Sequence, residues 1–261
     1  MTTTPLLSIE GLQVRYGAIE AVTDATISVM PGEFVGVIGS NGAGKSSTMR
    51  ATAGVLKPAG GRVRFDGADV TGRPGHDMVR LGVAMVPEGR MIFGDQTVQE
   101  NLLLGAFSRV TRNDPTVAND MEEVLQLFPR LRERLSQLGG SLSGGEQQML
   151  AIARGLLSKP RLLIVDELSL GLAPKILDML FPILAQLNKG GLSILLVEQM
   201  ASYALQVTAR TYVMENGRTI FSGPSRELAK DDRVLDAYLG RHRSQENKSD
   251  PPSGTKQGAA S

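Results

Sequence analysis

The segment Phe34–Ser46 limits the possible folds of this chain more than any other segment. The apolar run Phe34–Ile38 leads into the octapeptide GSNGAGKS, which matches the pattern G-x-x-x-x-G-K-[ST] at every fixed position. Glycines in such a turn let backbone N–H groups point inward around phosphate oxygens, and the start of the following helix adds its dipole. The segment therefore predicts a strand, a phosphate-binding loop and, from about Ser46, a helix in direct succession.

The loop predicts binding of ATP with Mg²⁺. Lys45 would bring a positive charge to the β- and γ-phosphates, and the Ser46 hydroxyl would bind the metal ion. A glycine-rich turn that matches by chance is the alternative, but the flanking strand and helix argue against it. The residues predicted to contact the nucleotide here are Gly39, Ser40, Asn41, Gly42, Ala43, Gly44, Lys45, Ser46 and Ser47.

Two carboxylates, Asp166 and Glu167, follow the apolar run Leu162–Val165. Consecutive apolar residues are typical of a parallel strand covered on both faces, and the carboxyl end of such a strand faces the ligand crevice. We predict that Asp166 holds Mg²⁺ through water and that Glu167 is the general base for the attacking water. A solvated strand end or a helix N-cap is the alternative.

A second candidate anion site begins a helix predicted over residues 144–157. Its sequence, LSGGEQ, places Ser143 directly before Gly144 and Gly145, and exposed N–H groups at a helix start attract anions. Ordinary helix capping by Ser143 is the alternative. Because this site lies far from Lys45 in the sequence, the two phosphate sites together suggest a composite site.

The remaining pattern predicts an α/β domain over residues 1–240, with a helical insert at about 90–155. Residues 241–261 have prolines, glycines and almost no large apolar side chain, and therefore predict a disordered tail. Two short helices are expected near Arg226 and Val234. The other predicted elements are strands at 6–14, 63–65, 83–86 and 193–197, helices at 97–107, 121–128 and 175–188, and a hairpin of 211–214 with 219–221 around Asn216 and Gly217.

Composition excludes several classes of function. The chain has no Cys, which rules out disulfides and thiolate metal sites. Its 28 Lys and Arg against 27 Asp and Glu leave a net charge of +1, so no nucleic-acid partner is expected. We see no signal-peptide pattern and no apolar run of membrane-spanning length, so a soluble chain is expected, and any permease would be a separate polypeptide.

The phosphate loop and the LSGGEQ string together resemble the ABC ATPase family. The resemblance implies a P-loop NTPase fold of the ABC type, with a mixed sheet core, an antiparallel β region and a helical subdomain. It also implies a head-to-tail dimer, in which Ser143, Gly144 and Gly145 of one subunit face the γ-phosphate held by Lys45 of the other. Tyr16 would stack on adenine, with packing on a sheet edge as the alternative.

Three positions depart from the general family pattern: Glu88 replaces the usual Gln, Gln199 the switch His, and Ala173 the usual Asp of the D-loop. With the strings VPEGR, SLGLAP and LLVEQ, these departures resemble the Liv-type (LivF-like) ATPases of branched-chain amino acid importers, over about residues 7–240. The resemblance implies that Glu88 helps to bind Mg²⁺ and senses the γ-phosphate, and that the catalytic Gln199 contacts the γ-phosphate. Leu168, where Pro is usual, and Met200, where Asn is usual, depart from this subfamily too.

The implied function is ATP hydrolysis that powers uptake of branched-chain amino acids at the cytoplasmic face of the cytoplasmic membrane. The implied partners are a second ATPase subunit, two permease subunits and, indirectly, a substrate-binding protein. Met91, Ile92 and Phe93 look exposed and would help form the permease docking groove, with burial in the core as the alternative. The open alternatives for function are import of urea or short amides, a non-transport ABC ATPase, and a nucleotide-binding regulator that no longer hydrolyses ATP.

Overall fold

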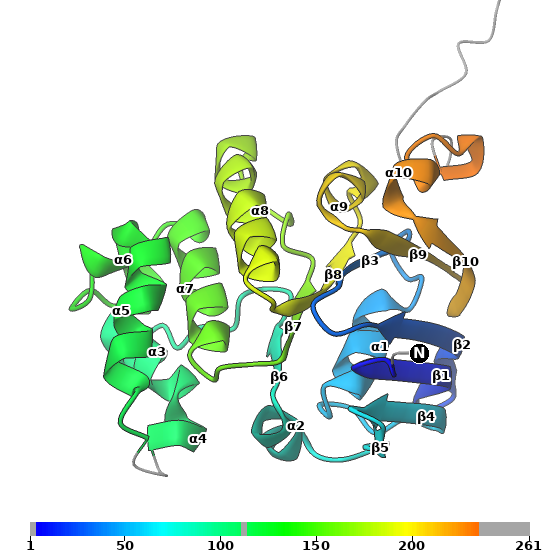
Figure 1. The fold of residues 1–261 in the computed structure, drawn as a ribbon, viewed down its shortest axis with the longest axis horizontal. Coiled ribbons are helices and arrows are strands. Elements are labelled where there is room, and N and C mark those ends of the chain that lie inside the picture. The colour runs from blue at the N-terminus through cyan, green and yellow to red at the C-terminus, as the bar shows by residue number, and fades with distance from the viewer. Residues whose placement is uncertain (1–3, 111–113, 235–261) are drawn as a thin grey trace, which may run out of the picture.

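In the computed structural model, which describes residues 4–110 and 114–234, ten strands form one mixed sheet (Figure 1). Their order across the sheet is β5-β4-β1-β2-β10-β9-β3-β8-β7-β6. The strands are β1 Leu7–Tyr16, β2 Ile19–Val29, β3 Phe34–Ile38, β4 Gly60–Phe65, β5 Ala68–Asp69, β6 Val83–Val86, β7 Leu162–Asp166, β8 Ser193–Glu198, β9 Arg210–Glu215 and β10 Arg218–Pro224.

The sheet has a parallel part and an antiparallel part. Strands β6, β7, β8, β3 and β9 are parallel neighbours, whereas β1, β2, β4 and β5 pair antiparallel. In β7, Leu163 and Val165 join the core cluster that includes the helices of the insert, while Leu162 and Ile164 join the cluster beneath the antiparallel strands. Burial on both faces explains the consecutive apolar residues. The predicted mixed sheet with an antiparallel region is confirmed.

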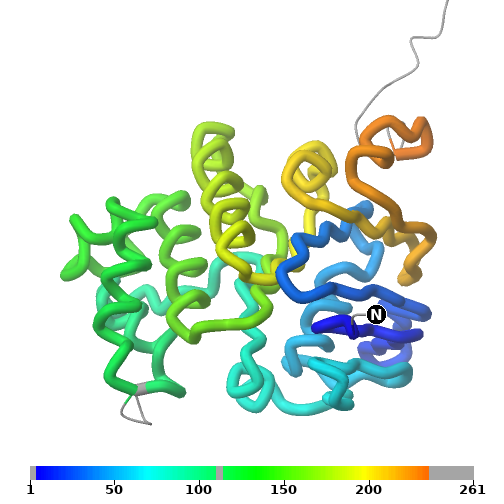
Figure 2. Tube along the Cα trace, in the orientation of Figure 1, coloured from blue at the N-terminus to red at the C-terminus, as the bar shows by residue number. Residues whose placement is uncertain are grey.

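Strand β2 was absent from the elements predicted from sequence. Its buried residues Ala25, Ile27 and Val29 alternate with exposed or half-buried polar ones, which is the period-two pattern of a strand with one buried face. It pairs antiparallel with β1 and parallel with β10 at Arg218 and Asp24. Figure 2 shows this early segment beside the orange strands from the other end of the chain.

The helices of the insert gather at one end of the molecule, away from β1, β2 and β4 (Figure 1). This group, α3 to α7, spans residues 98–156, whereas the sequence predicted a helical insert at about 90–155. The helices are α1 Lys45–Thr52, α2 Gly75–Leu81, α3 Val98–Gly105, α4 Phe107–Val110, α5 Val117–Leu127, α6 Pro129–Arg132, the 3-10 turn η1 Gly139–Ser141, α7 Gly144–Leu156, α8 Pro174–Lys189, α9 Ala201–Val207 and α10 Ser225–Leu228.

The predicted hairpin is present as β9 and β10, with Asn216 and Gly217 in its turn. Of the two predicted terminal helices, α10 corresponds to the one near Arg226, and helical residues near Val234 begin at Asp232. The predicted tail at 241–261 lies outside the described residues. Within the part of the chain that the structure describes, no helix combines the length and apolar character needed to cross a bilayer.

Helix α3 is held in place at both ends. Thr97 caps its start, and the Thr97 side chain and Glu100 form a reciprocal capping box. Its last residue, Gly105, packs so tightly on α7 that a Cβ there would lie 2.1 Å from the carbonyl oxygen of Arg154. This contact helps fix the insert against the helix that follows the second candidate anion site.

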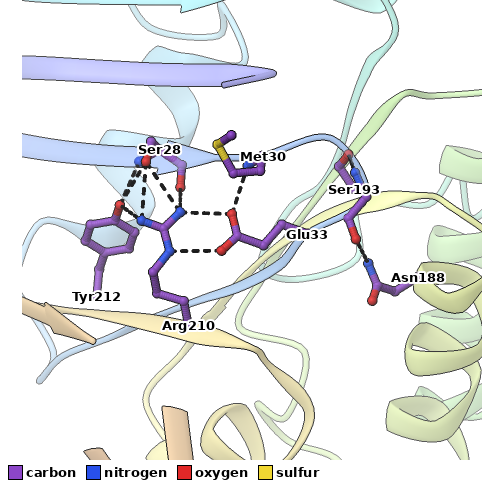
Figure 3. A network of polar contacts seen from close by, with 8 residues as sticks. Ser28, Met30, Glu33, Asn188, Ser193, Arg210 and Tyr212 are labelled. Atoms are coloured by element: carbon purple, nitrogen blue, oxygen red, sulfur yellow. Dashed lines mark hydrogen bonds and ion pairs between the residues drawn. The ribbon is translucent and has the colours of Figure 1, made fainter. Parts of the chain in front are cut away.

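A polar network joins β9 to the connection between β2 and β3 (Figure 3). The Arg210 guanidinium donates two hydrogen bonds to Glu33, from Nε to Oε1 at 2.9 Å and from Nη2 to Oε2 at 2.9 Å. It also donates to the Ser28 carbonyl and to the Tyr212 hydroxyl, and Glu33 accepts the N–H of Met30 at 2.8 Å. This bidentate pair ties the antiparallel region to the parallel strands.

Candidate nucleotide-binding site

A cleft of about 390 Å³ lies at the carboxyl ends of β3, β7 and β8. These strands are parallel neighbours, so the loops that follow them meet at one edge of the sheet, where α/β proteins bind ligands. The cleft is lined by Ala21, Asn41, Gly42, Ala43, Gly44, Lys45, Ser46, Ser47, Glu88, Glu167, Leu170 and Gln199.

The fixed glycines of the loop are required by close backbone contacts. A Cβ on Gly39 would lie 2.4 Å from the carbonyl oxygen of Met214, and one on Gly44 would lie 2.7 Å from that of Ala21. Gly44 also has φ +95°, a conformation that side chains with a Cβ rarely adopt. Neighbouring strands therefore press against the loop and hold its shape.

Lys45 lies buried at the base of the cleft, with 3% of its side chain exposed. Its ammonium donates hydrogen bonds to the carbonyl oxygens of Gly39 and Ser40, at 3.0 and 3.1 Å. The same nitrogen lies 3.4 Å from Oε1 of Glu167. The structure thus brings together the cation and the carboxylate that the sequence assigned to phosphate binding and water activation.

Asp166 and Ser46 offer a set of oxygen atoms that suits Mg²⁺. The Ser46 hydroxyl donates to Oδ1 of Asp166 at 3.0 Å, and Oδ2 of this carboxylate is buried without a partner among the described residues. Burial, and then the charges of Glu167 and Glu88, raise the pKa of Asp166 to about 6. Mg²⁺ prefers oxygen ligands and would stabilise the ionised carboxylate. These residues therefore fit the metal ion predicted from the sequence.

Glu167 has an unusual backbone conformation for a residue with a side chain. Its φ is +50°, in the left-handed region, and its N–H donates to the carbonyl oxygen of Val197 at 2.9 Å. Leu168, which stands where the subfamily usually has Pro, is completely buried. The turn after β7 is thus anchored to β8 by its backbone and to the core by Leu168.

The second candidate anion site lies apart from the cleft. Ser143 caps α7 and forms a capping box with Glu146, so the expected alternative of ordinary helix capping is present. A Cβ on Gly144 would lie 3.1 Å from the guanidinium of Arg90, and one on Gly145 would lie 3.0 Å from Ile176. Figure 1 shows α7 and α1 on different sides of the β6 and β7 strands, so one chain does not bring the two sites together.

The other predicted site residues lie around the cleft. Tyr16, at the end of β1, is 42% exposed, and its hydroxyl lies 3.4 Å from that of Ser47. Glu88 and Gln199 line the cleft from the loops after β6 and β8. Gln199 is exposed, as its predicted contact with a phosphate requires.

The expectation that Met91, Ile92 and Phe93 are all exposed is wrong for Ile92. Met91 and Phe93 are 60% and 52% exposed, but Ile92 packs against the main core. Arg90 and Met91 both have positive φ values, which turn the chain so that only alternate side chains face outward. Arg154 holds this turn by donating from Nη2 to the carbonyl oxygens of Arg90 and Met91, at 3.3 and 2.7 Å.

Sequence reasoning missed several residues at the site. Ala21 lines the cleft from β2, and the alternating pattern of that strand is the signal that predicts its presence. Leu170 lines the cleft three residues after Glu167. Glu198 is completely buried behind Gln199 and accepts hydrogen bonds from Ser169, a contact that no local pattern predicts.

Comparisons with known proteins show which family has a similar sequence. Residues 22–169 match the family described as ABC transporter. The chain is 46% identical, over 90% of its length and 100% of the relative, to the high-affinity branched-chain amino acid transport ATP-binding protein BraG of Pseudomonas aeruginosa. It is 32% identical to a probable branched-chain amino acid transport ATP-binding protein, LivF of Archaeoglobus fulgidus, over 88% of the chain and 96% of the relative.

Solved structures show the same fold. A nucleotide-free ATP-binding cassette from an ABC transporter superposes with a TM-score of 0.78 at 25% identity, covering 91% of this chain and 100% of the other. The ADP conformation of an ATP-binding cassette of an ABC transporter superposes with a TM-score of 0.78 at 26% identity, with the same coverage. The P-loop cleft, the LSGGEQ helix and these matches over most of the chain establish that it belongs to the ABC transporter ATPase family.

Proposed function

We propose that this chain hydrolyses ATP with Mg²⁺ in a composite site formed by two subunits. The observation that carries the proposal is the position of the Lys45 ammonium, 3.4 Å from the carboxylate of Glu167 at the base of the cleft. Ser46 and Asp166 would hold Mg²⁺, which neutralises charge on the phosphate oxygens when it is bound. Tyr16 would stack on the adenine, and Glu88 would face the γ-phosphate at the metal end.

Lys45 and Glu167 would change partners when the nucleotide binds. Phosphate oxygens carry more negative charge than one carboxylate, so they would replace Glu167 as the counter-ion of Lys45. The freed carboxylate would then accept a proton from the attacking water. Gln199 would donate a hydrogen bond to the γ-phosphate from its side-chain NH₂, without a proton to exchange.

The second half of the site would come from a partner subunit in head-to-tail orientation. The first turn of α7 has backbone N–H groups that cannot bond within the helix, and such groups at a helix start attract anions. Ser143, Gly144 and Gly145 would therefore bind the γ-phosphate held by Lys45 of the opposite subunit. The position of α7 and α1 on different sides of β6 and β7 (Figure 1) supports this arrangement.

Purified Glu167→Gln tests the catalytic assignment. The amide keeps the volume of the carboxylate but cannot accept a proton, so turnover should fall about 10²- to 10⁴-fold while ATP binding persists. The variant should also accumulate as an ATP-bound dimer in size-exclusion chromatography with light scattering. Lys45→Ala is the matched variant that should lose ATP binding itself. Normal phosphate release by Glu167→Gln would reject Glu167 as the base.

We further propose that the chain powers uptake of branched-chain amino acids, as a peripheral subunit at the cytoplasmic face of the membrane. Support comes from BraG, whose whole length matches 90% of this chain. Two permease subunits, and indirectly a substrate-binding protein, would complete the transporter. Uptake of labelled leucine, compared with urea and a short amide, tests the substrate class in membranes reconstituted with the permease.

A groove beside the insert supports docking on the permease. A space of about 550 Å³ is lined by Phe93, Gln96, Glu100, Leu103, Leu104 and Phe107. A neighbouring space of about 450 Å³ shares Phe93 and Leu104 and is also lined by Arg154, whose Nη1 is buried without a partner among the described residues. A short apolar segment with a free carbonyl or carboxylate oxygen would cover this surface and satisfy Arg154.

Phe93→Asp tests the groove, because a charge on a residue that lines both spaces opposes apolar docking. The variant should fail to co-purify with the permease while its ATP binding and melting temperature stay unchanged. Ile220→Asp is the matched control, since Ile220 is similarly exposed, at 46%, but lies on β10. Assembly of the Phe93→Asp variant with the permease would reject the groove as the docking surface.

A further inference from the structure

Glu198 is a buried carboxylate directly before Gln199, at the end of β8. None of its surface is exposed. Oε1 accepts the N–H of Ser169 at 3.0 Å, and Oε2 accepts the Ser169 hydroxyl at 2.5 Å. Both oxygens of this carboxylate therefore bind one residue of the turn that follows Glu167.

Packing alone gives no reason for a carboxylate at this position. The preceding residues of β8, Ile194–Val197, are buried and apolar, so an apolar side chain would continue the strand. The pKa of Glu198 is raised to about 7, mainly because the carboxyl is buried. The charge of Glu167 also raises this pKa, whereas the hydrogen bonds from Ser169 and the charge of Lys45 lower it. A buried charge is tolerated at such a place when it fixes a particular geometry.

The geometry that Glu198 fixes is the turn carrying the catalytic carboxylate. Glu167 has a φ of +50°, which is unfavourable for a residue with a Cβ, so surrounding contacts must hold it there. Its N–H is bound by the carbonyl oxygen of Val197, and Ser169 is bound by the side chain of Glu198. Two consecutive residues of β8 thus hold the two ends of a three-residue turn.

We infer that Glu198 is a positioning residue for ATP hydrolysis: through its two hydrogen bonds to Ser169, it holds the turn that aims Glu167 into the cleft. This inference rests on the proposed role of Glu167 as the general base. Glu198 itself is fully buried and is not one of the residues that line the cleft. Its effect should therefore appear in the rate of hydrolysis and not in the affinity for ATP.

Substitutions of Glu198 give the first test. Glu198→Ala removes both hydrogen bonds, and kcat should fall about 10- to 100-fold, the size expected when a catalytic group moves by about 1 Å. KM and the Kd for ATP should stay within about twofold of wild type. Glu198→Gln should restore turnover, because its amide can accept the Ser169 N–H and donate to the Ser169 hydroxyl. Failure of the Gln variant to restore turnover in a folded protein would overturn the inference.

Ser169 provides a test that leaves no large cavity. Ser169→Ala removes only the hydroxyl bond and should reduce kcat less than Glu198→Ala, whereas Ser169→Thr keeps the hydroxyl and should retain turnover. These variants remain decisive if Glu198→Ala does not fold. Equal loss of kcat and ATP affinity in folded Ser169→Ala would indicate general damage to the cleft and overturn the inference.

A double-mutant cycle separates the role of Glu198 as a positioning residue from the role of Glu167 as the base. Single-turnover hydrolysis of labelled ATP is compared for Glu167→Gln, Glu198→Ala and the double variant. If Glu198 acts through Glu167, adding Glu198→Ala to Glu167→Gln should change the residual rate less than threefold. If the rate losses of the two single variants multiply in the double variant, the positioning role of Glu198 is overturned, but the proposed role of Glu167 as the base is not. Full turnover by Glu167→Gln alone would instead reject the proposed base.

Discussion

The buried carboxyl of Glu198 should make the stability of this protein fall as the pH rises. Its pKa is raised from an ordinary 4.5 to about 7, mainly by burial. A carboxyl with a higher pKa in the folded state binds its proton more tightly there than in the unfolded chain. Ionisation of Glu198 therefore opposes folding. Its contribution to the free energy of unfolding is fully present below the pKa of the unfolded state and is lost as the pH rises through the pKa of the folded state.

The size of the effect follows from the two pKa values. The interval from 4.5 to about 7, at about 1.4 kcal/mol per pH unit, corresponds to about 3 kcal/mol, most of it between pH 5 and pH 8. For a chain of this size, about 2 to 3 kcal/mol changes the melting temperature by roughly 5 to 10 °C. Asp166, whose pKa is raised to about 6, should contribute in the same direction.

Glu198→Gln isolates the contribution of Glu198 because it leaves Asp166 in place. Urea unfolding without nucleotide or Mg²⁺, at pH 5 and pH 8, gives the free energy of unfolding for each protein. The variant and the wild type should agree closely at pH 5, and the variant should be about 2 kcal/mol more stable at pH 8. Glu215→Gln, at an exposed end of β9, is the control and should follow the wild type. Parallel pH curves for Glu198→Gln and wild type would refute the reasoning.

Three further substitutions test separate contacts. Gly105→Ala places a Cβ 2.1 Å from the Arg154 carbonyl oxygen, so α3 and α7 must separate, and urea unfolding should show a loss of about 2 kcal/mol or more. Glu33→Gln breaks the bidentate pair with Arg210 (Figure 3) and should lower the free energy of unfolding by about 1 to 3 kcal/mol; an unchanged value would mean that the pair is energetically neutral. Gln199→Ala should reduce kcat in a phosphate-release assay more than it weakens ATP binding, and unchanged kcat would exclude a role for this side chain in this subunit.

Local sequence determined the parts of the site that depend on neighbours along the chain. The phosphate loop was predictable because the turn, the lysine and the helix start lie within one short segment, and its glycines are demanded by close backbone contacts. The runs in β3, β7 and β8 were predictable because a strand buried on both faces cannot include exposed polar residues. The positions of Asp166 and Glu167 were predictable for the same reason, since they come directly after the apolar run Leu162–Val165.

Only the tertiary structure decided contacts between distant segments. The inward position of Ile92 depends on a turn held by Arg154, sixty-two residues away in the sequence, so exposure could not be judged from the local pattern. The bond between Glu198 and Ser169 joins the end of β8 to the turn after β7, and it exists because β7 and β8 pair in one register. Strand order and register arise from the balance of all side-chain contacts across the sheet, and that balance is a property of the folded chain.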